Sequence, residues 1–283
     1  MKYGIVVDSS CDLKMLGPGY GRIDYTRVPL KLDVGDKEFA DDENLDIDVF
    51  LDELYAYKGK TGSAAPSPAD WLAAFEKSEN VFVLTITGAL SGSYASAQVA
   101  MRMFLDKYPD RKIYLLDTLS TGPEMILLAR RVEELALLGE SFETIRGNIN
   151  EYHRHLHLFF ALQSLENLIK NGRVNRIAGN IAGILGIKIL GCASEHGTLE
   201  MMFKLRGKRN VYDKMVSEMA ARGFKGGKAV ITHCQNEETA EYVAAEIRKQ
   251  YPDSDIDILP TGGLCSYYAE RGGILLGFEG DVI

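Results

Sequence analysis

The sequence predicts an α/β fold in which two α/β domains enclose a ligand cavity between them. Two observations support this prediction. Short β-branched runs alternate with helical patterns in both halves. The 283 residues suit two domains of roughly 100–200 residues each. We expect an N-terminal domain over residues 1–155 with a parallel sheet and a C-terminal domain over 156–283 with a mixed sheet.

The N-terminal half contains three candidate strands: Lys2–Asp8, Val81–Thr87 and Lys112–Asp117. Each is followed by a loop that carries Ser or Thr. Ligands of open α/β sheets bind beyond the carboxyl ends of the strands. The sequence therefore predicts that three loops converge on one crevice: Ser9-Ser10, Ser91-Gly92-Ser93 and Thr118–Thr121.

A helix is predicted to start at Pro68, with Ser67 as its N-cap and Asp70 as the acidic member of a capping box. Its buried stripe consists of Trp71, Leu72 and Phe75. Ser67 is accordingly interpreted as a cap and not as a ligand contact.

A second helix is predicted over about Tyr94–Tyr108, with Ser91 as its natural N-cap. Helix N-termini leave N–H groups unpaired and carry partial positive charge, so they bind carboxylates or phosphates. Ser91 and Ser93 are each candidates for such a contact, and capping or solvation explains them equally well.

Residues 147–157 are polar and include His153, His155 and His157 at alternate positions. If these residues form a strand, the three histidines lie on the same face of it and could bind a metal ion. The histidine run Tyr152–His157 contains no acidic or cysteine ligand, which favours an exposed connector between the domains.

The C-terminal half begins with a strand, Leu158–Leu162, and a helix, Ser164–Lys170, ended by Asn171-Gly172. The glycine-spaced segment 177–186 is interpreted as close helix packing or a ligand wall. A hairpin of Lys188–Ser194 and Leu199–Leu205 comes next. The remaining elements are helices near 211–222 and 237–250 and strands near 228–234, 255–259 and 273–278.

Composition excludes several classes of function. The net charge of −8 and the lack of a basic stripe argue against nucleic-acid binding. An early Asp8 argues against a secretory signal, and no apolar run is long enough to span a bilayer, so we expect a cytoplasmic protein without an integral membrane segment. Four widely spaced cysteines predict free thiols and no metal site, and no cofactor motif is present.

Several motifs, in this order and spacing, resemble the DegV family of fatty-acid-binding proteins. They are Asp8–Leu13, Val28-Pro29-Leu30, Ser63–Pro68, Leu90–Ala97, Leu116-Asp117-Thr118 with Gly122, Leu165–Arg173 and Ile187-Lys188. The resemblance implies two α/β domains that enclose one long-chain fatty acid.

The resemblance also implies which residues hold the carboxylate. Ser63 matches the family's head-group threonine, with Thr61 just outside it, and the second loop is matched by Ser91, Gly92 and Ser93. A family histidine near the C-terminus is absent, so Thr261, Cys265 or Ser266 would substitute for it.

Burial of an acyl chain is worth roughly 0.8 kcal/mol per methylene, so the affinity for such a ligand would come mainly from its tail. Candidate residues of the tail wall are Ile177, Ile181, Ile184, Leu185 and Ile187. Plain hydrophobic core is the alternative interpretation for about half of these side chains.

In the family, the bound fatty acid is presented to a separate kinase that phosphorylates its carboxylate. Arg173 and Arg206 match the family's arginines near the cavity mouth, which engage the kinase or the incoming phosphate. The sequence has no G-x-S-x-G elbow, which favours a carrier over a serine hydrolase. An enzyme acting on a small acyl or phosphorylated metabolite in the same cleft is the alternative.

Overall fold

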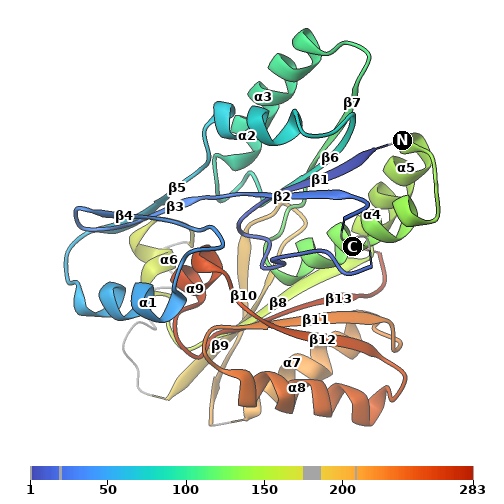
Figure 1. Ribbon diagram of the computed structural model, residues 1–283. Coiled ribbons are helices and arrows are strands. Elements are labelled where there is room, and N and C mark those ends of the chain that lie inside the picture. Colours follow the sequence, from blue (N-terminus) through green and yellow to red (C-terminus); the bar gives the residue numbers. More distant parts are fainter. Residues whose placement is uncertain (1, 19–20, 175–185, 208, 283) are drawn as a thin grey trace.

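The computed structural model describes residues 2–18, 21–174, 186–207 and 209–282, and it contains three sheets (Figure 1). The first sheet is parallel in the order β2-β1-β6-β7. Its strands are β1 (Tyr3–Asp8), β2 (Asp24–Val28), β6 (Asn80–Thr85) and β7 (Lys112–Asp117). The three predicted strands are confirmed, and β2 is an edge strand that the sequence analysis did not assign.

Both faces of this parallel sheet are covered by helices, as its fully buried central strands require. Alternate residues of β1 and β6 point to opposite faces. Val6 and Val83 pack against α2 (Pro68–Phe75) and α3 (Ser93–Lys107). Ile5 and Phe82 belong to the core that α4 (Pro123–Leu137) and α5 (Phe142–His153) complete on the other face.

The second sheet is mixed, with six strands in the order β10-β9-β8-β13-β11-β12. Their bounds are β8 (Leu156–Leu162), β9 (Ile187–Ala193), β10 (Leu199–Arg206), β11 (Lys228–His233), β12 (Asp255–Pro260) and β13 (Ile274–Glu279). Helices α7 (Asn210–Ala221) and α8 (Glu237–Gln250) cover one face. These elements confirm the mixed sheet, the hairpin and both helices predicted for the C-terminal half.

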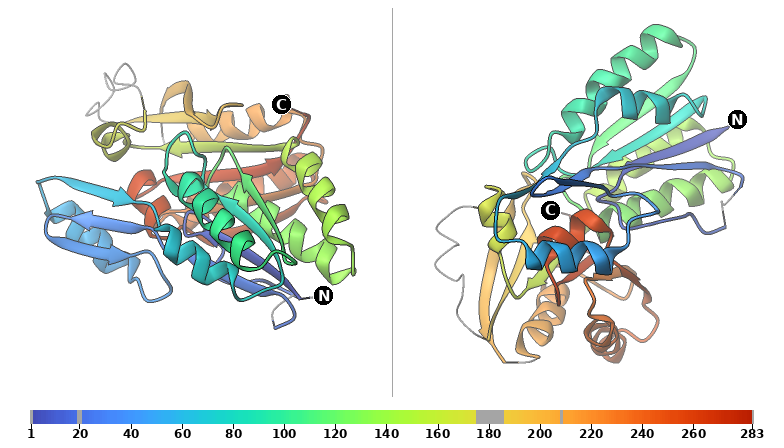
Figure 2. Two further views of the ribbon diagram at one scale, coloured as in Figure 1. Left: turned by 90° about the horizontal axis from the view of Figure 1, so that it is seen from above. Right: turned by 60° about the vertical axis from the view of Figure 1, so that its left-hand side comes forward.

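A third, smaller sheet was not predicted. It is antiparallel in the order β4-β3-β5, from β3 (Lys31–Val34), β4 (Lys37–Ala40) and β5 (Thr61–Ala64). Together with α1 (Ile47–Ala56) this sheet lies beside α9 (Gly263–Ala269), a helix close to the C-terminus of the chain (Figure 2). Ser63 is therefore on a strand and not in a loop.

The predicted connector at residues 147–157 is wrong. Those residues form the end of α5 and the start of β8, and the intervening turn is short. His157 is buried and stacks on Phe278, while the ring of His153 bonds to the carbonyl of Thr118 at 2.7 Å. The burial of His153 and His157 depends on elements distant in the sequence, so the local pattern of polar residues does not reveal it.

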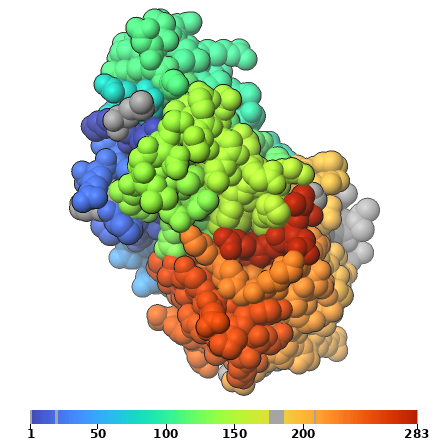
Figure 3. All heavy atoms as spheres, turned by 90° about the vertical axis from the view of Figure 1, so that its right-hand side faces the viewer, coloured from blue at the N-terminus to red at the C-terminus, as the bar shows by residue number. Residues whose placement is uncertain are grey.

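Helix α4 also links the two large sheets, because it packs on β1 and β6 as well as on β8, β11 and β13. Figure 3 shows the surface of the α4 and α5 region, in yellow-green, lying against both N-terminal and C-terminal segments. The first sheet precedes residue 155 and the second follows it. The division into two domains at that residue stays a prediction.

Candidate ligand-binding site

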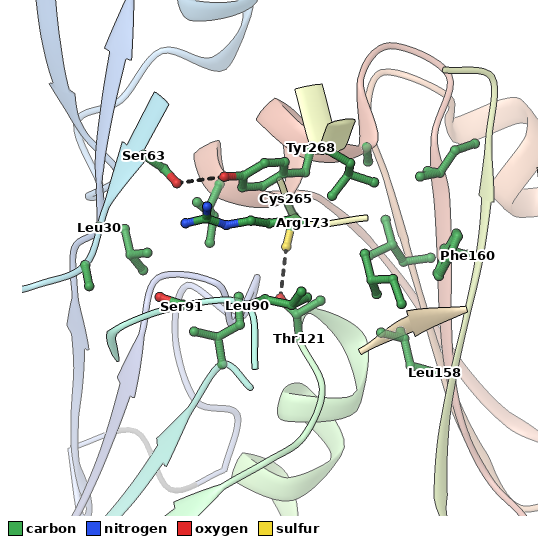
Figure 4. A pocket seen from close by; sticks show the side chains of 18 of the residues that line it. Leu30, Ser63, Leu90, Ser91, Thr121, Leu158, Phe160, Arg173, Cys265 and Tyr268 are labelled. Carbon is green, nitrogen blue, oxygen red and sulfur yellow. Dashed lines mark hydrogen bonds between the residues drawn. The ribbon is translucent and has the colours of Figure 1, made fainter. Parts of the chain in front are cut away.

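A cavity lies between the N-terminal sheet and the inner face of the mixed sheet (Figure 4). Its empty space amounts to about 790 Å³ when the part open to solvent is included. The described residues that line it are Leu30, Ser63, Ala65, Ile86, Leu90, Ser91, Gly92, Thr121, Leu158, Phe160, Leu162, Leu168, Arg173, Leu199, Leu264, Cys265, Tyr268, Ala269 and Leu275.

One end of the cavity carries its polar groups. Ser63 projects from β5 and its Oγ lies 2.9 Å from the hydroxyl of Tyr268 on α9. Ser91 and Gly92 precede the first turn of α3, whose N-cap residue Gly92 has no side chain to offer, and Ser91 Oγ accepts a hydrogen bond from the N–H of Ser93 at 3.2 Å. Arg173 follows the short helix α6 (Glu166–Lys170) and contributes the positive charge. This arrangement suits a carboxylate or another small anion.

Burial raises the pKa of Tyr268, although Ser63 and Arg173 counteract part of that rise. The tyrosine therefore keeps its proton at neutral pH. A neutral hydroxyl can donate a hydrogen bond to an anion or pass one on to Ser63.

The other end of the cavity is apolar. Leu158, Phe160 and Leu162 come from alternate positions of β8 and point away from α7, whereas Phe159 and Ala161 pack on the α7 side. Leu168 from α6, Leu199 from β10 and Leu275 from β13 complete this wall. An aliphatic chain fits here because every group it would touch is itself apolar.

The three predicted loops meet around the buried carboxylate of Asp8, but of their residues Ser91, Gly92 and Thr121 line the cavity, whereas Ser9 and Ser10 do not. Its Oδ2 accepts hydrogen bonds from the Ser93 hydroxyl at 2.6 Å and from the N–H of Ile86 at 2.9 Å, and its Oδ1 accepts from Ser10. The N–H of Gly122 donates to the carbonyl of Ser10 at 2.9 Å, which ties in the third loop. Ser93 is thus directed at Asp8, and it is not among the residues that line the cavity.

Helix α9 is held in place by two carboxylates of the N-terminal half. Asp12 accepts from the N–H of Gly262 at 2.7 Å, and Asp41 accepts from Gly263 and Leu264 at 2.7 and 2.9 Å. The backbone N–H groups at the start of α9 are therefore already bound. Their bonds fix Cys265 and Tyr268 against the cavity.

The other predicted carboxylate contacts lie outside this lining. Thr61 bonds to the hydroxyl of Tyr267 at 2.7 Å. Thr261 bonds to Ser266 Oγ at 2.7 Å and to the carbonyl of His233, so both hydroxyls have protein partners. Cys265, another candidate to replace the family histidine, does line the cavity and donates from Sγ to the carbonyl of Ser10 at 3.3 Å.

The predicted tail wall is tested little by the structure. Ile177, Ile181, Ile184 and Leu185 lie outside the described residues, and Ile187 starts β9 without lining the cavity. Arg206 is exposed at the end of β10, opposite Ile187, and does not line the cavity either. The sequence analysis missed Tyr268 and the inward stripe of β8, because residues 158–162 are apolar throughout and their pattern does not distinguish one face of the strand from the other.

Comparison with known proteins decides the family. The profile described as "Uncharacterised protein, DegV family" matches residues 2–279. The chain belongs to the DegV family. A DegV domain-containing protein of Streptococcus pneumoniae is 42% identical over 281 residues, which cover 99% of this chain and all of that protein.

Solved structures of DegV proteins share the fold throughout. The fatty acid kinase (Fak) B3 protein of Streptococcus pneumoniae, loaded with linoleic acid, is 42% identical with a TM-score of 0.97 over 99% of this chain and 100% of that one. A DegV protein of Eubacterium eligens, loaded with heptadecanoic acid, is 39% identical with a TM-score of 0.94 over 99% and 100% of the two chains. The predicted α/β fold class of the DegV type is confirmed.

Within the described ranges, the helices are too short or too polar to cross a bilayer. The same residues contain no group of three or more His, Cys, Asp or Glu side chains placed to hold a metal ion.

Proposed function

We propose that this DegV protein binds one long-chain fatty acid in the cavity and presents its carboxylate to a separate fatty acid kinase. The observation that carries the proposal is the division of the cavity into a hydroxyl- and arginine-bearing end and an apolar end. A fatty acid has the same division. Related DegV proteins loaded with linoleic and heptadecanoic acid support this assignment.

In this proposal the tail supplies most of the affinity. Each buried methylene contributes roughly 0.8 kcal/mol, so a chain of about sixteen carbons contributes on the order of 10 kcal/mol before ordering costs. The carboxylate lies among Ser63, Ser91, Gly92 and Arg173, where the polar groups orient it. Thr61, Ser93 and Thr261 do not contact the carboxylate in this proposal. Each instead forms a hydrogen bond that positions a neighbouring side chain: Thr61 with Tyr267, Ser93 with Asp8 and Thr261 with Ser266.

The lining favours a carrier over an enzyme. Among the described residues, neither a histidine nor a carboxylate side chain lines the cavity. Hydrolysis or acyl transfer needs a base to activate its nucleophile. We therefore assign the phosphorylation of the carboxylate to a separate kinase that uses ATP. Because ATP is a cytoplasmic substrate, we propose that the protein acts in the cytoplasm. We also propose that Arg173 and the exposed Arg206 lie on the surface that contacts the kinase.

The test has two steps. Native mass spectrometry of freshly purified protein should show about one fatty acid per chain, and delipidation should lower the melting temperature, because a ligand bound only by the folded state stabilises it. The loaded protein should then support phosphorylation of the fatty acid by a fatty acid kinase with ATP.

In the second step, Arg173→Lys and Arg206→Ala should retain the ligand but lose phosphorylation, since lysine lacks the two parallel donors of a guanidinium. Arg102→Ala, an exposed arginine of α3, is the control and should behave as wild type. Recovery of no lipid would refute ligand binding. Full phosphorylation with both variants would refute the role of these arginines in presentation.

A further inference from the structure

A second cavity adjoins the apolar end of the first. It is lined by Thr118, Leu119, Glu124, His153, Arg154, Leu156, Leu158, Ala193, Ser194 and Glu195, with an empty space of about 620 Å³ including its open part. Among the residues that the structure describes, Leu158 alone lines both cavities. In Figure 4, Leu158 and Phe160 lie on the side of the first cavity away from Ser63 and Ser91.

The side chains of β8 show how the two cavities are arranged. Alternate residues of a strand share a face and follow each other at about 6–7 Å. Along this face, Leu162 and Phe160 line only the first cavity, Leu158 lines both, and Leu156 lines only the second. Leu158 is 2% exposed. Its side chain therefore stands as the partition between them.

The space behind Leu158 differs in chemistry from the space in front of it. Glu124, at the start of α4, is 4% exposed, and burial raises its pKa to about 8. The His153 ring lies 3.8 Å from the Glu124 carboxyl group. An alkyl chain that entered this space would displace water from polar groups without replacing their hydrogen bonds, which is unfavourable.

We propose that Leu158 sets the upper limit of acyl-chain length in this protein. The proposal rests on the proposed function, because it assigns the end wall of the same fatty-acid site. A chain whose methyl end reaches Leu158 fills the apolar cavity. A longer chain is stopped by the leucine and, behind it, by the polar groups at Glu124 and His153.

The experiment measures affinities for saturated fatty acids in two-carbon steps, from about fourteen to about twenty-two carbons, with delipidated protein. In Leu158→Ala the two cavities join. The affinity for the acid one two-carbon step beyond the wild-type optimum should rise about fifteenfold, because each further buried methylene is worth roughly fourfold in affinity. Still longer acids should gain nothing more, because they would meet the polar groups at Glu124 and His153. Leu158→Phe should move the optimum to shorter acids.

Leu162→Ala is the matched control. Leu162 lies on the same face of the same strand, is 3% exposed and lines only the first cavity. Its truncation should weaken binding of all lengths without moving the optimum. Thermal unfolding identifies any variant that fails to fold. If Leu158→Ala does not fold, the shift to shorter acids expected of Leu158→Phe still tests the proposal.

The outcomes separate the two proposals. If wild-type protein binds none of the acids, the proposed function fails. If wild-type protein binds them but neither Leu158 variant moves the optimum, or Leu162→Ala moves it equally, Leu158 does not limit chain length and the proposed function stands.

Discussion

Two serines only two residues apart have different surroundings at the start of α3. Ser91 lines the cavity, and its Oγ accepts a hydrogen bond from the N–H of Ser93 at 3.2 Å. Ser93 is fully buried, and its hydroxyl donates to Asp8. Without the Ser93 hydroxyl, the buried carboxylate of Asp8 would lose one of its hydrogen-bond donors. Such a loss is costly because the protein interior disfavours a charge that lacks hydrogen-bond partners. We infer that Ser91 serves the ligand and Ser93 serves the loops.

The first prediction separates these roles by alanine substitution. Ser91→Ala should weaken fatty-acid binding by about 0.5–1.5 kcal/mol with little change in the free energy of unfolding, since it removes one exchangeable hydrogen bond. Ser93→Ala should lower the free energy of unfolding by about 1–3 kcal/mol, because it leaves a buried acceptor short of a donor. Urea unfolding and ligand titration measure both. A larger loss of stability in Ser91→Ala would contradict the assignment.

At the scale of an element, α9 shows how a short helix is stabilised by the tertiary structure. Seven residues are too few for an independently stable helix in water. Its first N–H groups bond instead to Asp12 and Asp41, with Arg27 lying 3.8 Å from Asp41. Burial raises the pKa of both carboxyl groups, to about 6 for Asp12. The two aspartates act as N-terminal caps supplied from another part of the chain.

We expect Asp41→Ala to lower the free energy of unfolding by about 2–3 kcal/mol, since two backbone donors lose their acceptor. It should also weaken fatty-acid binding, because α9 positions Tyr268. The neighbouring Asp42, whose carboxylate accepts from Asn44 at a partly exposed turn, provides the control Asp42→Ala. Chemical denaturation and ligand titration would show both losses in Asp41→Ala alone. Equal behaviour of the two variants would overturn the capping role.

At the scale of the whole molecule, α4 connects the two large sheets. Its N-terminal turn lies so close to β13 that a Cβ at Gly277 would stand 2.7 Å from the backbone nitrogen of Glu124. Glu124 is consequently buried at the junction, and desolvation raises its pKa from 4.5 to about 8. The junction therefore contains a carboxyl group that is mostly neutral at physiological pH.

This burial predicts a pH dependence of stability. Between pH 4.5 and about 8 the folded state retains a proton on Glu124 that the unfolded chain has released, so the free energy of unfolding falls as pH rises. The isosteric Glu124→Gln cannot ionise and should lack this slope. Its stability relative to wild type should increase by up to about 1.4 kcal/mol per pH unit from pH 6.5 to 8. Urea unfolding across that range tests it, and a constant difference between the two proteins would argue against the shifted carboxyl group.

Local signals in the sequence were sufficient for most of the regular elements. Short β-branched and apolar runs predicted β1, β6, β7 and the strands of the mixed sheet, and the Ser67 capping box is present as predicted. The start of α3 was also close, since its N-cap is Gly92, one residue after the predicted Ser91. These features depend on neighbours a few residues away, which is why the chain reveals them without a structure.

The site needed the tertiary structure. Motif order along the chain indicated Ser63, Ser91 and Arg173, but not that Ser93 and Thr261 point at other protein groups. The pairing of Ser63 with Tyr268, 205 residues apart, and the partition at Leu158 follow from the packing of distant elements. By itself the sequence determined the family, most of the regular elements and the polar loops. Which side chains face the ligand was decided only by tertiary packing, because a residue's exposure depends on what the fold brings against it.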